Sequence, residues 1–453
     1  MVEIAIRNAF SRIDCTPEIH QSIRKLLSFE IPGSGFAQRA NPQWCWDGRT
    51  YLLKKNGTFP TGLLLRVENY LTENKIEFRT RDQRDVPRSN EKRFSINPSW
   101  EPRDYQLRAV SATQENHRGV INLGTGGGKT FLAALIMRSR GLDTLYVTPD
   151  TGLREQALDD FTDYFKNPGS LLSKDVASDY PIVVSNIQSL AKKKPEFFHR
   201  FGMLITDEFH HSSAASYQKL NHLVENAYYR YGQTGTFLRT DGTEMTMHGV
   251  LSEVIFTKTT SELIEEDWLV RPHITIYRYQ LNNWSRLSYR AAYDKIISDV
   301  AFNTLVSRIA QKKIDEGKQT LILIRRKDHG ELLNKMIEGS HYICGDDPIE
   351  HRKTVKRNFI QKKIRCLIAT GVLGEGQNIT SIDVLVNARL EKTEIQTTQG
   401  IGRALRKEFG KTMAEVFDFL IVGQKHLSAH SVERIGSYKK EPAFKISVVR
   451  APQ

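Results

Sequence analysis

The feature that most constrains the fold is a glycine-rich segment at residues 124–130, which reads Gly-Thr-Gly-Gly-Gly-Lys-Thr. It follows a short apolar run, 120–123, and precedes a stretch, 131–140, that predicts a helix. A loop between a buried strand and a helix gathers backbone N–H groups and the positive end of the helix dipole, which suits a phosphate group. The flanking strand and helix favour a phosphate-binding loop in an α/β sheet over a chance glycine turn.

Short apolar runs recur along the chain, and amphipathic stretches separate them. Runs of this length are typical of buried parallel strands, and their alternation with helices predicts doubly wound sheets. The alternation starts near residue 96 and begins again after Pro272, so we expect an α/β protein with two parallel-sheet lobes. The predicted strands are 120–123, 145–147, 182–184 and 203–205 in the first lobe, and 321–324, 366–369, 384–386 and 416–420 in the second.

The first part of the chain predicts a small α+β domain that precedes both lobes. Residues 17–29 predict a helix with Thr16 as its N-cap, and Asn56-Gly57 is a hairpin signal. The polar segment 80–93 predicts a linker. We therefore expect three domains, with boundaries 1–95, 96–271 and 272–453.

The charge balance favours a polyanionic partner. The chain has a net charge of +13 and a pI near 9.4. Residues 1–100 hold 16 Lys and Arg against 11 Asp and Glu. Nucleic acid is the commonest partner of such a surface, although the same excess also serves solubility.

The cysteines and the lack of long apolar segments indicate the compartment. Four cysteines are scattered without CxxC spacing, so we expect neither a zinc site nor a disulfide framework. No stretch approaches the roughly 18 apolar residues that span a bilayer, and the N-terminus lacks the apolar core of a signal peptide. We expect a cytoplasmic protein without a membrane partner.

Two adjacent acids, Asp207 and Glu208, end an apolar strand. Side chains at the carboxyl end of a parallel strand face the crevice where ligands bind. There, Asp207 suits a Mg²⁺ ion and Glu208 suits the orientation and deprotonation of a water molecule. A zinc interpretation of His210-His211 is less favourable, because no third ligand lies at suitable spacing.

The nucleotide site is expected to draw on the glycine-rich segment and on a tetrapeptide upstream of it. Lys129 suits the β- and γ-phosphates and Thr130 suits Mg²⁺. Gln106 can hydrogen-bond both edges of adenine and Arg103 can stack on the base, although this tetrapeptide can also be an ordinary helix start. The backbone that cradles the phosphates is expected to be that of Thr125, Gly126, Gly127 and Gly128.

In the second lobe, Gln399, Arg403 and Arg406 recur at spacings of four and three. On a helix these positions share a face, where two arginines repel each other unless they meet an anion. We expect them to meet the γ-phosphate. The alternative is a solvated basic helix end, since Lys407 and Lys411 follow.

In this order, the motifs resemble those of the superfamily 2 helicases of the DExH kind, over about residues 100 to 425. The resemblance implies two RecA-like lobes, ATP and Mg²⁺ as cofactors, and Gly376 at the nucleotide. One segment departs from the family pattern, because motif III, usually Ser-Ala-Thr, reads Thr-Gly-Thr here. The matching segments are 123–130, 207–210, 234–236, 370–376 and 399–406.

The N-terminal stretch narrows the resemblance to the phage UvsW-type branch-migration helicases. Residues 46–49, 60–63 and 235–242 are similar to segments of that family. The family implies ATP-driven remodelling of Holliday junctions, forks and R-loops in phage recombination, repair and replication, in the host cytoplasm. A duplex translocase that does not unwind, an RNA helicase, and a nucleotide-switched DNA-binding or annealing module remain alternatives.

The resemblance also implies contacts with the backbone of branched and single-stranded DNA. No base-reading pattern is present, so we expect no sequence specificity, and we expect a monomer. At any one position, local capping by Ser or Thr is nearly as good an interpretation. The basic run 352–365, with seven basic residues and no acid, predicts a solvated helix face or a duplex contact. The tryptophans near Arg49 can instead form a small core, and core is the better interpretation for at least one of them. The expected DNA contacts are Trp46, Arg49, Thr148, Arg154, Ser185, Gln188, Arg325 and Thr370.

Overall fold

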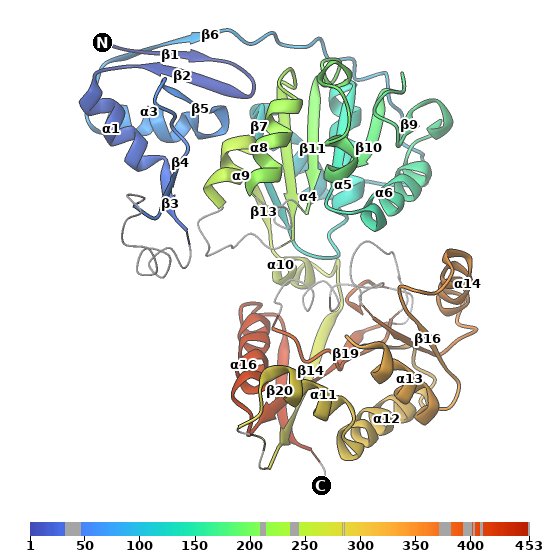
Figure 1. The fold of residues 1–453 in the computed structure, drawn as a ribbon. Helices are drawn as coiled ribbons and strands as arrows, with labels where there is room; N and C mark the ends of the chain where they lie inside the picture. The colour runs from blue at the N-terminus through green and yellow to red at the C-terminus, as the bar shows by residue number, and fades with distance from the viewer. Residues whose placement is uncertain are drawn as a thin grey trace. The chain divides into compact units, whose positions relative to one another are not determined.

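The computed structural model describes residues 1–31, 47–208, 214–235, 244–282, 284, 286–370, 382–392, 401, 404–407 and 411–451 (Figure 1). Contacts divide the chain into two compact units, one of residues 1–123 and 128–258 and one of residues 124–127 and 259–453. Within the described residues, we find no helix with the length and apolar character that a bilayer span requires.

The chain begins with a four-stranded sheet in the order β5-β2-β1-β6. β6 runs parallel to β1, whereas β2 is antiparallel to both β1 and β5. Helices α1 and α3 cover one face and bury Ile23 and Val67 against Val2 and Ile4. A separate two-stranded ribbon joins β3 and β4. The elements are β1 Val2–Ile6, β2 Phe10–Asp14, α1 Pro17–Leu26, β3 Ser28–Glu30, β4 Arg49–Tyr51, β5 Thr58–Pro60, α3 Leu64–Glu73 and β6 Phe78–Asp82.

Four local predictions for this region need correction, in whole or in part. The helix ends at Leu26 rather than at residue 29, and the Thr16 side chain makes no cap hydrogen bond. Residues 80–82 belong to β6 rather than to a linker, because pairing with β1 satisfies their backbone while their side chains stay exposed. Asn56-Gly57 does form a turn, but the strand after it pairs with β2. A Cβ on Gly57 would lie 2.2 Å from the Ile13 carbonyl oxygen, so this close approach requires glycine.

The first seven-stranded sheet has the order β13-β7-β12-β11-β8-β10-β9, and all its strands are parallel. Helices cover both faces: Tyr146 packs on Phe161 of α6, while its neighbours Leu145 and Val147 pack in a cluster with Leu220 of α8. All four predicted strands are confirmed. The strands are β7 Arg118–Leu123, β8 Thr144–Thr148, β9 Leu172–Ser173, β10 Ile182–Asn186, β11 Met203–Asp207, β12 Tyr229–Thr234 and β13 Val254–Lys258. The helices are α4 Asp104–Glu115, α5 Lys129–Arg140, α6 Thr151–Tyr164, α7 Ile187–Leu190, α8 Ala214–Leu223 and α9 Glu244–Leu251.

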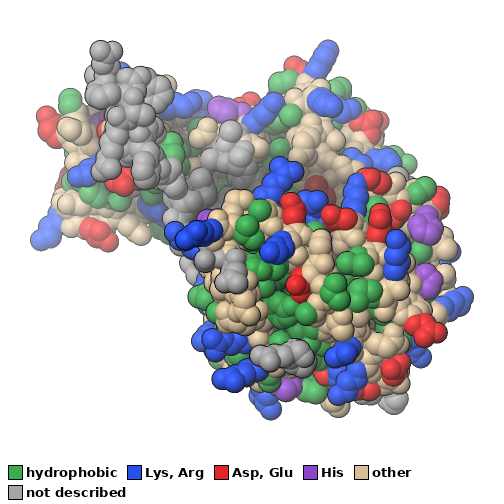
Figure 2. Space-filling view, turned by 60° about the horizontal axis from the view of Figure 1, so that its bottom comes forward, with side chains coloured by type: hydrophobic (Ala, Val, Ile, Leu, Met, Phe, Trp, Pro, Cys, Tyr) green, Lys and Arg blue, Asp and Glu red, His purple; other side chains and the backbone are tan. Residues whose placement is uncertain are grey.

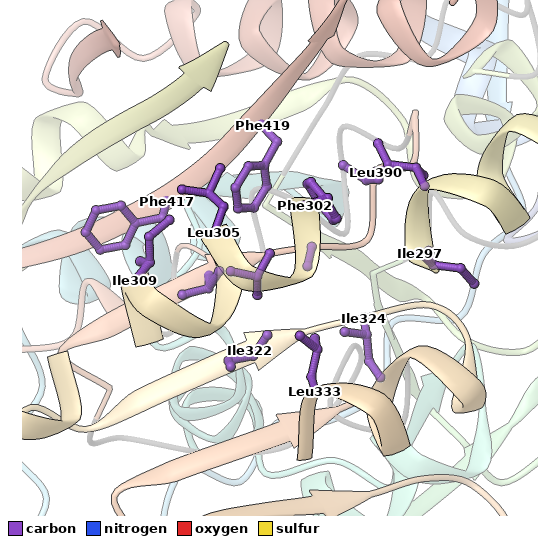
Figure 3. Packing of buried hydrophobic residues seen from close by; sticks show 14 of the residues in the cluster. Ile297, Phe302, Leu305, Ile309, Ile322, Ile324, Leu333, Leu390, Phe417 and Phe419 are labelled. Atoms are coloured by element: carbon purple, nitrogen blue, oxygen red, sulfur yellow. The ribbon is translucent and has the colours of Figure 1, made fainter. Parts of the chain in front are cut away.

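The second seven-stranded sheet has the order β16-β17-β15-β18-β19-β14-β20 and is also parallel throughout. Its core packs Phe302 and Leu305 of α12 against Phe419 of β19, and Leu333 of α13 against Ile322 of β15 (Figure 3). The four predicted strands are again confirmed. The strands are β14 Arg271–Gln280, β15 Thr320–Leu323, β16 Ser340–Ile343, β17 Cys366–Ala369, β18 Val384–Asn387, β19 Met413–Val422 and β20 Lys445–Arg450. The helices are α10 Thr260–Glu265, α11 Tyr289–Ile297, α12 Val300–Asp315, α13 Lys327–Met336, α14 Ile349–Ile360 and α16 Lys425–Lys439.

Two parallel sheets and a small α+β sheet region confirm the predicted fold class. Because all strands of each large sheet are parallel, their carboxyl ends share one edge. The glycine-rich loop follows β7 and the acid pair ends β11, so both lie at the same edge of the first sheet.

Candidate nucleotide site and nucleic-acid contacts

The loop between β7 and α5 has a backbone that only glycine adopts readily. Gly126 has a φ of 88° and Gly128 a φ of 78°, in the left-handed region where a side chain is strained. A Cβ on Gly124 would lie 2.5 Å from the backbone nitrogen of Thr260, at the start of α10 in the same unit. These three positions therefore need glycine for different reasons, two for backbone conformation and one for close packing.

The predicted phosphate ligands surround the beginning of α5. Lys129 is the first residue of that helix and Thr130 the second, so the positive end of the helix dipole lies beside both. Thr125 and Thr130 are partly exposed, whereas Gly127 is buried and its N–H donates to the Gly124 carbonyl at 3.0 Å. The arrangement leaves side chains of the loop available at its surface while the backbone holds its shape.

Lys129 reaches the acid pair at the end of β11. Its Nζ lies 2.8 Å from Glu208 Oε1, and only 13% of the Lys129 side chain and 8% of the Glu208 side chain are exposed. Glu208 has a φ of 41°, which is a strained conformation for a glutamate. Its backbone N–H donates to Asp207 Oδ1 at 3.0 Å. One lysine thus faces two carboxyl groups in a buried place.

Asp207 is electrostatically unusual. Burial, and next the neighbouring Glu208 charge, raise the pKa of Asp207 to about 7. Tyr146 lies beside this carboxyl, and burial together with Asp207 raises the pKa of the tyrosine well above its ordinary value. A carboxyl whose ionised form is this unfavourable gains most from a cation. Tyr146 was not predicted, because within an apolar strand only its register against β11 distinguishes it.

Gln106 connects the upstream tetrapeptide to the loop. Its Oε1 accepts a hydrogen bond from the Arg103 backbone N–H at 3.0 Å, and its Nε2 donates to the Gly128 carbonyl at 3.4 Å. Arg103 donates to the Tyr105 hydroxyl at 2.9 Å. The helix-start interpretation is therefore correct for the capping contacts of α4. The same contacts place the amide of Gln106 against the phosphate-loop backbone, so the two interpretations are compatible.

Of the second-lobe residues expected at the nucleotide, Gln399, Arg403 and Gly376 lie outside the described residues. Arg406 lies beyond the helical residues 401 and 404, in an antiparallel bridge with Leu269. The prediction that Arg406 shares a helix face is therefore wrong. The chain leaves the helix because the Leu405 carbonyl accepts a hydrogen bond from the Val270 N–H at 2.8 Å.

The predicted DNA contacts of the first lobe lie near the ends of β8 and β10 or in the helices that follow them, and they differ in exposure. Thr148 and Ser185 are almost fully buried, and the Thr148 hydroxyl donates to the Asp150 carbonyl at 3.0 Å. Gln188 is exposed at the start of the next helix, and Arg154 forms an ion pair with Glu155 at 2.5 Å. The Thr148 hydroxyl thus has a local structural contact and Ser185 is buried, while Gln188 remains accessible.

Arg325 and Arg49 are also held by contacts within their own units, whereas Thr370 is shown only to be buried. Arg325 Nε lies 2.9 Å from Glu391, and its Nη1 donates to the Tyr289 hydroxyl. Thr370 is buried just after β17. Arg49 binds Glu30 at 3.0 Å and donates to Ser28 across the β3–β4 ribbon. Trp46, which we expected to accompany Arg49, lies outside the described residues.

The basic run 352–365 forms most of α14 and the turn after it. Val355 and Phe359 are buried, whereas Lys353, Arg357 and Lys363 are exposed, as in an amphipathic surface helix. On the face of the molecule in Figure 2, basic side chains are interspersed with acidic ones. An exposed basic face is what both the solvated-face and the duplex-contact interpretations require.

Comparisons with known proteins agree with this geometry. Residues 99–239 match the family model "Type III restriction enzyme, res subunit", residues 301–408 match "Helicase conserved C-terminal domain", and residues 6–80 match "DNA helicase UvsW, N-terminal". The curated "ATP-dependent DNA helicase uvsW" of Enterobacteria phage T4 is 27% identical over 95% of each chain.

Two further relatives extend the comparison. The "DNA 3'-5' translocase XPB2" of Sulfurisphaera tokodaii is 30% identical over 69% of this chain and 80% of that protein. A solved structure of S. cerevisiae Dbp5 bound to RNA and ADP BeF3 has a TM-score of 0.54 at 15% identity, covering 81% of this chain and 96% of that one, and shows the fold alone. The phosphate loop, the acid pair and these matches together show that the chain belongs to the superfamily 2 DExH helicases and resembles the phage UvsW-type branch-migration helicases among them.

Proposed function

We propose that this protein is an ATP-dependent DNA helicase that remodels branched DNA such as Holliday junctions, forks and R-loops. The observation that carries the proposal is the largely buried Lys129–Glu208 pair, 2.8 Å apart, between the phosphate loop and the end of β11. It supplies a cation for a phosphate and a carboxylate for a water molecule at one edge of the sheet. The T4 relative and the Sulfurisphaera tokodaii relative named above are a DNA helicase and a DNA translocase, which favours DNA over RNA.

The residues at this edge fit ATP with Mg²⁺. Glycine backbone at 124–128 and the start of α5 offer N–H donors for phosphate oxygens, and Thr130 offers a hydroxyl for the metal. Asp207, whose ionised form is destabilised by burial, suits the same cation. When bound, this pair supplies a phosphoanhydride whose terminal phosphoryl group can pass to water.

The protein's own groups would act in sequence. Lys129 and Glu208 neutralise each other while the loop has no ligand, and Lys129 would turn to the phosphates on binding. Glu208 would then be available to orient a water molecule and accept its proton. Gln106, held against Gly128, would position the adenine together with Arg103.

The remaining assignments complete the proposed motor. Residues 1–95 would form a basic DNA-binding domain, 96–271 the first lobe and 272–453 the second lobe, in a cytoplasmic monomer. Gln399, Arg403, Arg406 and Gly376 would meet the nucleotide from the second lobe. The proposed DNA contacts are Trp46, Arg49, Thr148, Arg154, Ser185, Gln188, Arg325 and Thr370.

A panel of nucleic acids tests the proposal. We expect ATPase activity to be stimulated by single-stranded DNA and four-way junctions more than by RNA, with strand separation on forked DNA. Lys129→Ala should abolish both activities. DNA effects that survive Lys129→Ala would indicate an annealing module, stimulation by RNA alone an RNA helicase, and ATPase activity without strand separation a duplex translocase.

A further inference from the structure

The four-stranded N-terminal sheet has one face that helices α1 and α3 do not cover. Both helices pack on the side of Val2 and Ile4. The register of the strands puts Arg81, Ala5, Arg12 and Thr58 side by side in one row on the opposite side. The row therefore has a small residue at its centre and guanidinium groups on both flanks.

This face forms the floor of a cavity of about 910 Å³, which we call the seam cleft. Ala5, Arg7, Arg12 and Thr58 line its floor, and Arg84 lines it from the segment after β6. The opposite wall comes from the first seven-stranded sheet, where residues 199–202 lead into β11 and residues 225–226 lead towards β12. Both walls belong to the same compact unit.

The seam cleft has an excess of positive charge. Its lining carries Arg7, Arg12, Arg84 and Arg200 against the acids Asp85 and Glu225. Arg84 is bonded to Asp82, and Arg200 lies 3.6 Å from Asp143. Arg12, by contrast, is exposed and forms no ion pair with any residue that the structure describes. At least one guanidinium is therefore presented to the cavity without an internal partner.

Two buried arginines behind the walls add to this positive potential. Arg118 donates to the Asn8 carbonyl at 2.7 Å, while its Nε and Nη1 have no hydrogen-bond partner among the described residues. Arg230 is fully buried and bonded to Asn221 and to backbone carbonyls. Neither forms a salt bridge with a described carboxylate. A buried charge without a close counter-ion is costly. The lining acid Glu225 attracts Arg230, and an anion in front of the wall would offset the cost for Arg118.

The two walls are joined closely enough to keep the seam cleft in shape. Asn221 donates to the Ala9 carbonyl at 3.0 Å, and Arg66 pairs with Glu253 at 2.6 Å. A Cβ on Gly62 would lie 2.0 Å from the His248 carbonyl oxygen, so the two backbones touch there. A site that is already shaped loses less entropy when it binds its ligand.

We propose that the seam cleft binds the phosphodiester backbone of a DNA strand in one arm of a branched substrate. The proposal rests on the proposed function and places a DNA contact away from Arg49, whose donors bind Glu30 and Ser28. The seam cleft lies at the amino-terminal ends of β11 and β12, and Asp207 is at the opposite end of β11. It is separated from the nucleotide edge by the length of β11, about 17 Å. It would therefore hold an arm rather than the strand on which the motor moves.

The test measures affinity for a labelled DNA duplex and a four-way junction, over a range of salt concentrations and without nucleotide. Arg12→Ala should weaken binding by about 3- to 10-fold at low salt and reduce the slope of log K against log salt by about 1. The double variant Arg7→Ala/Arg12→Ala should reduce the slope by about 2. Glu225→Gln removes an acid from the lining and should strengthen binding.

Lys25→Ala is the matched control, because it removes one exposed positive charge from α1, on the other side of the same sheet. Unchanged unfolding midpoints would show that the variants fold. Equal effects of Lys25→Ala and Arg12→Ala, or no effect of either, would overturn the proposal. The wild-type ATPase assay with single-stranded DNA separates the two ideas, since failure there removes the helicase function whatever the seam cleft does.

Discussion

Each of the two large sheets contains a buried ion pair, and the pairs differ in how completely they are satisfied. In the second sheet, Asp418 and Arg434 are each 1% exposed and 3.0 Å apart. Asn387 and Tyr438 also donate to Asp418, while Arg434 donates to the carbonyls of Glu391 and Phe419. Each charge therefore has a full set of partners.

In the first sheet, one lysine faces two carboxyl groups. Lys129 pairs with Glu208, which has a strained backbone, and the adjacent Asp207 has a pKa raised to about 7. The comparison indicates that a buried ion pair with a full set of hydrogen-bond partners has a structural role. A lysine that faces two carboxyl groups instead leaves one acid without a counter-ion, which favours the binding of a cation. The predictions below test this distinction, beginning with the largest expected effect.

Glu208→Gln should reduce ATP turnover by about 10²- to 10⁴-fold, because the amide cannot accept a proton from water. Steady-state ATPase measurements at saturating DNA check this, and a fluorescent nucleotide checks that binding persists. As a control, Glu433→Gln changes an exposed acid of the second lobe. Turnover near the wild-type rate in Glu208→Gln would mean that this carboxylate has no part in the reaction.

Arg434→Met should lower the free energy of unfolding by about 3–5 kcal/mol, because it leaves Asp418 buried without its counter-ion. Chemical denaturation measures the loss. The double variant Arg434→Met/Asp418→Leu should be less destabilised than the sum of the single changes. Full additivity would contradict the interpretation of the pair as one structural unit.

Asp207→Asn should stabilise the nucleotide-free protein, and the gain should grow as the pH rises. The folded pKa of about 7 lies above the ordinary value of 3.8, so stability is lost as the pH rises towards and through 7. In the wild type, the free energy of unfolding falls by at most about 4 kcal/mol over this pH range. Unfolding midpoints at pH 5.5 and pH 8 should therefore differ less in the variant than in the wild type. An equal pH dependence in both proteins would refute the assignment.

The second sheet should show the opposite pH dependence through His329. Burial lowers the pKa of His329 to about 4, from 6.5, and its Nε2 lies 2.9 Å from Asn303 Oδ1. Stability is therefore present above pH 6.5 and lost as the pH falls towards 4, by up to about 3 kcal/mol. In His329→Gln, the free energy of unfolding should therefore change less between pH 6.5 and pH 4 than it does in the wild type. Chemical denaturation at a series of pH values measures this difference.

Much of the fold was predictable because buried parallel strands have an unambiguous pattern. The eight strands that were predicted are mostly apolar runs, and none of them is an edge strand of its sheet. The strands that were missed lack a continuous apolar run. β12 reads Tyr-Arg-Tyr-Gly-Gln-Thr, and its Arg230 is buried because the side chain donates to backbone carbonyls such as that of Ala227. β20 is a largely exposed edge strand. Their strand character depends on neighbours that are distant in sequence.

The candidate site was predictable to the same degree. Its loop and its acid pair are contiguous motifs, whose local chemistry restricts what they can do. The position of Arg406 was not predictable, because its conformation is determined by pairing with Leu269, more than a hundred residues earlier. The contacts of Arg49 with Glu30 and Ser28 were not predictable either, because these residues become its neighbours only when β3 and β4 pair.

By itself, the sequence determined the class of fold, the phosphate loop and the identity of the acids at the strand end. These depend on the spacing of residues along the chain and on backbone rules that act locally. Only the tertiary structure decided that Lys129 contacts Glu208, that Tyr146 lies beside Asp207 and that Arg12 lines the basic seam cleft. Such contacts arise where strand register and domain packing bring together charges that sequence spacing cannot relate.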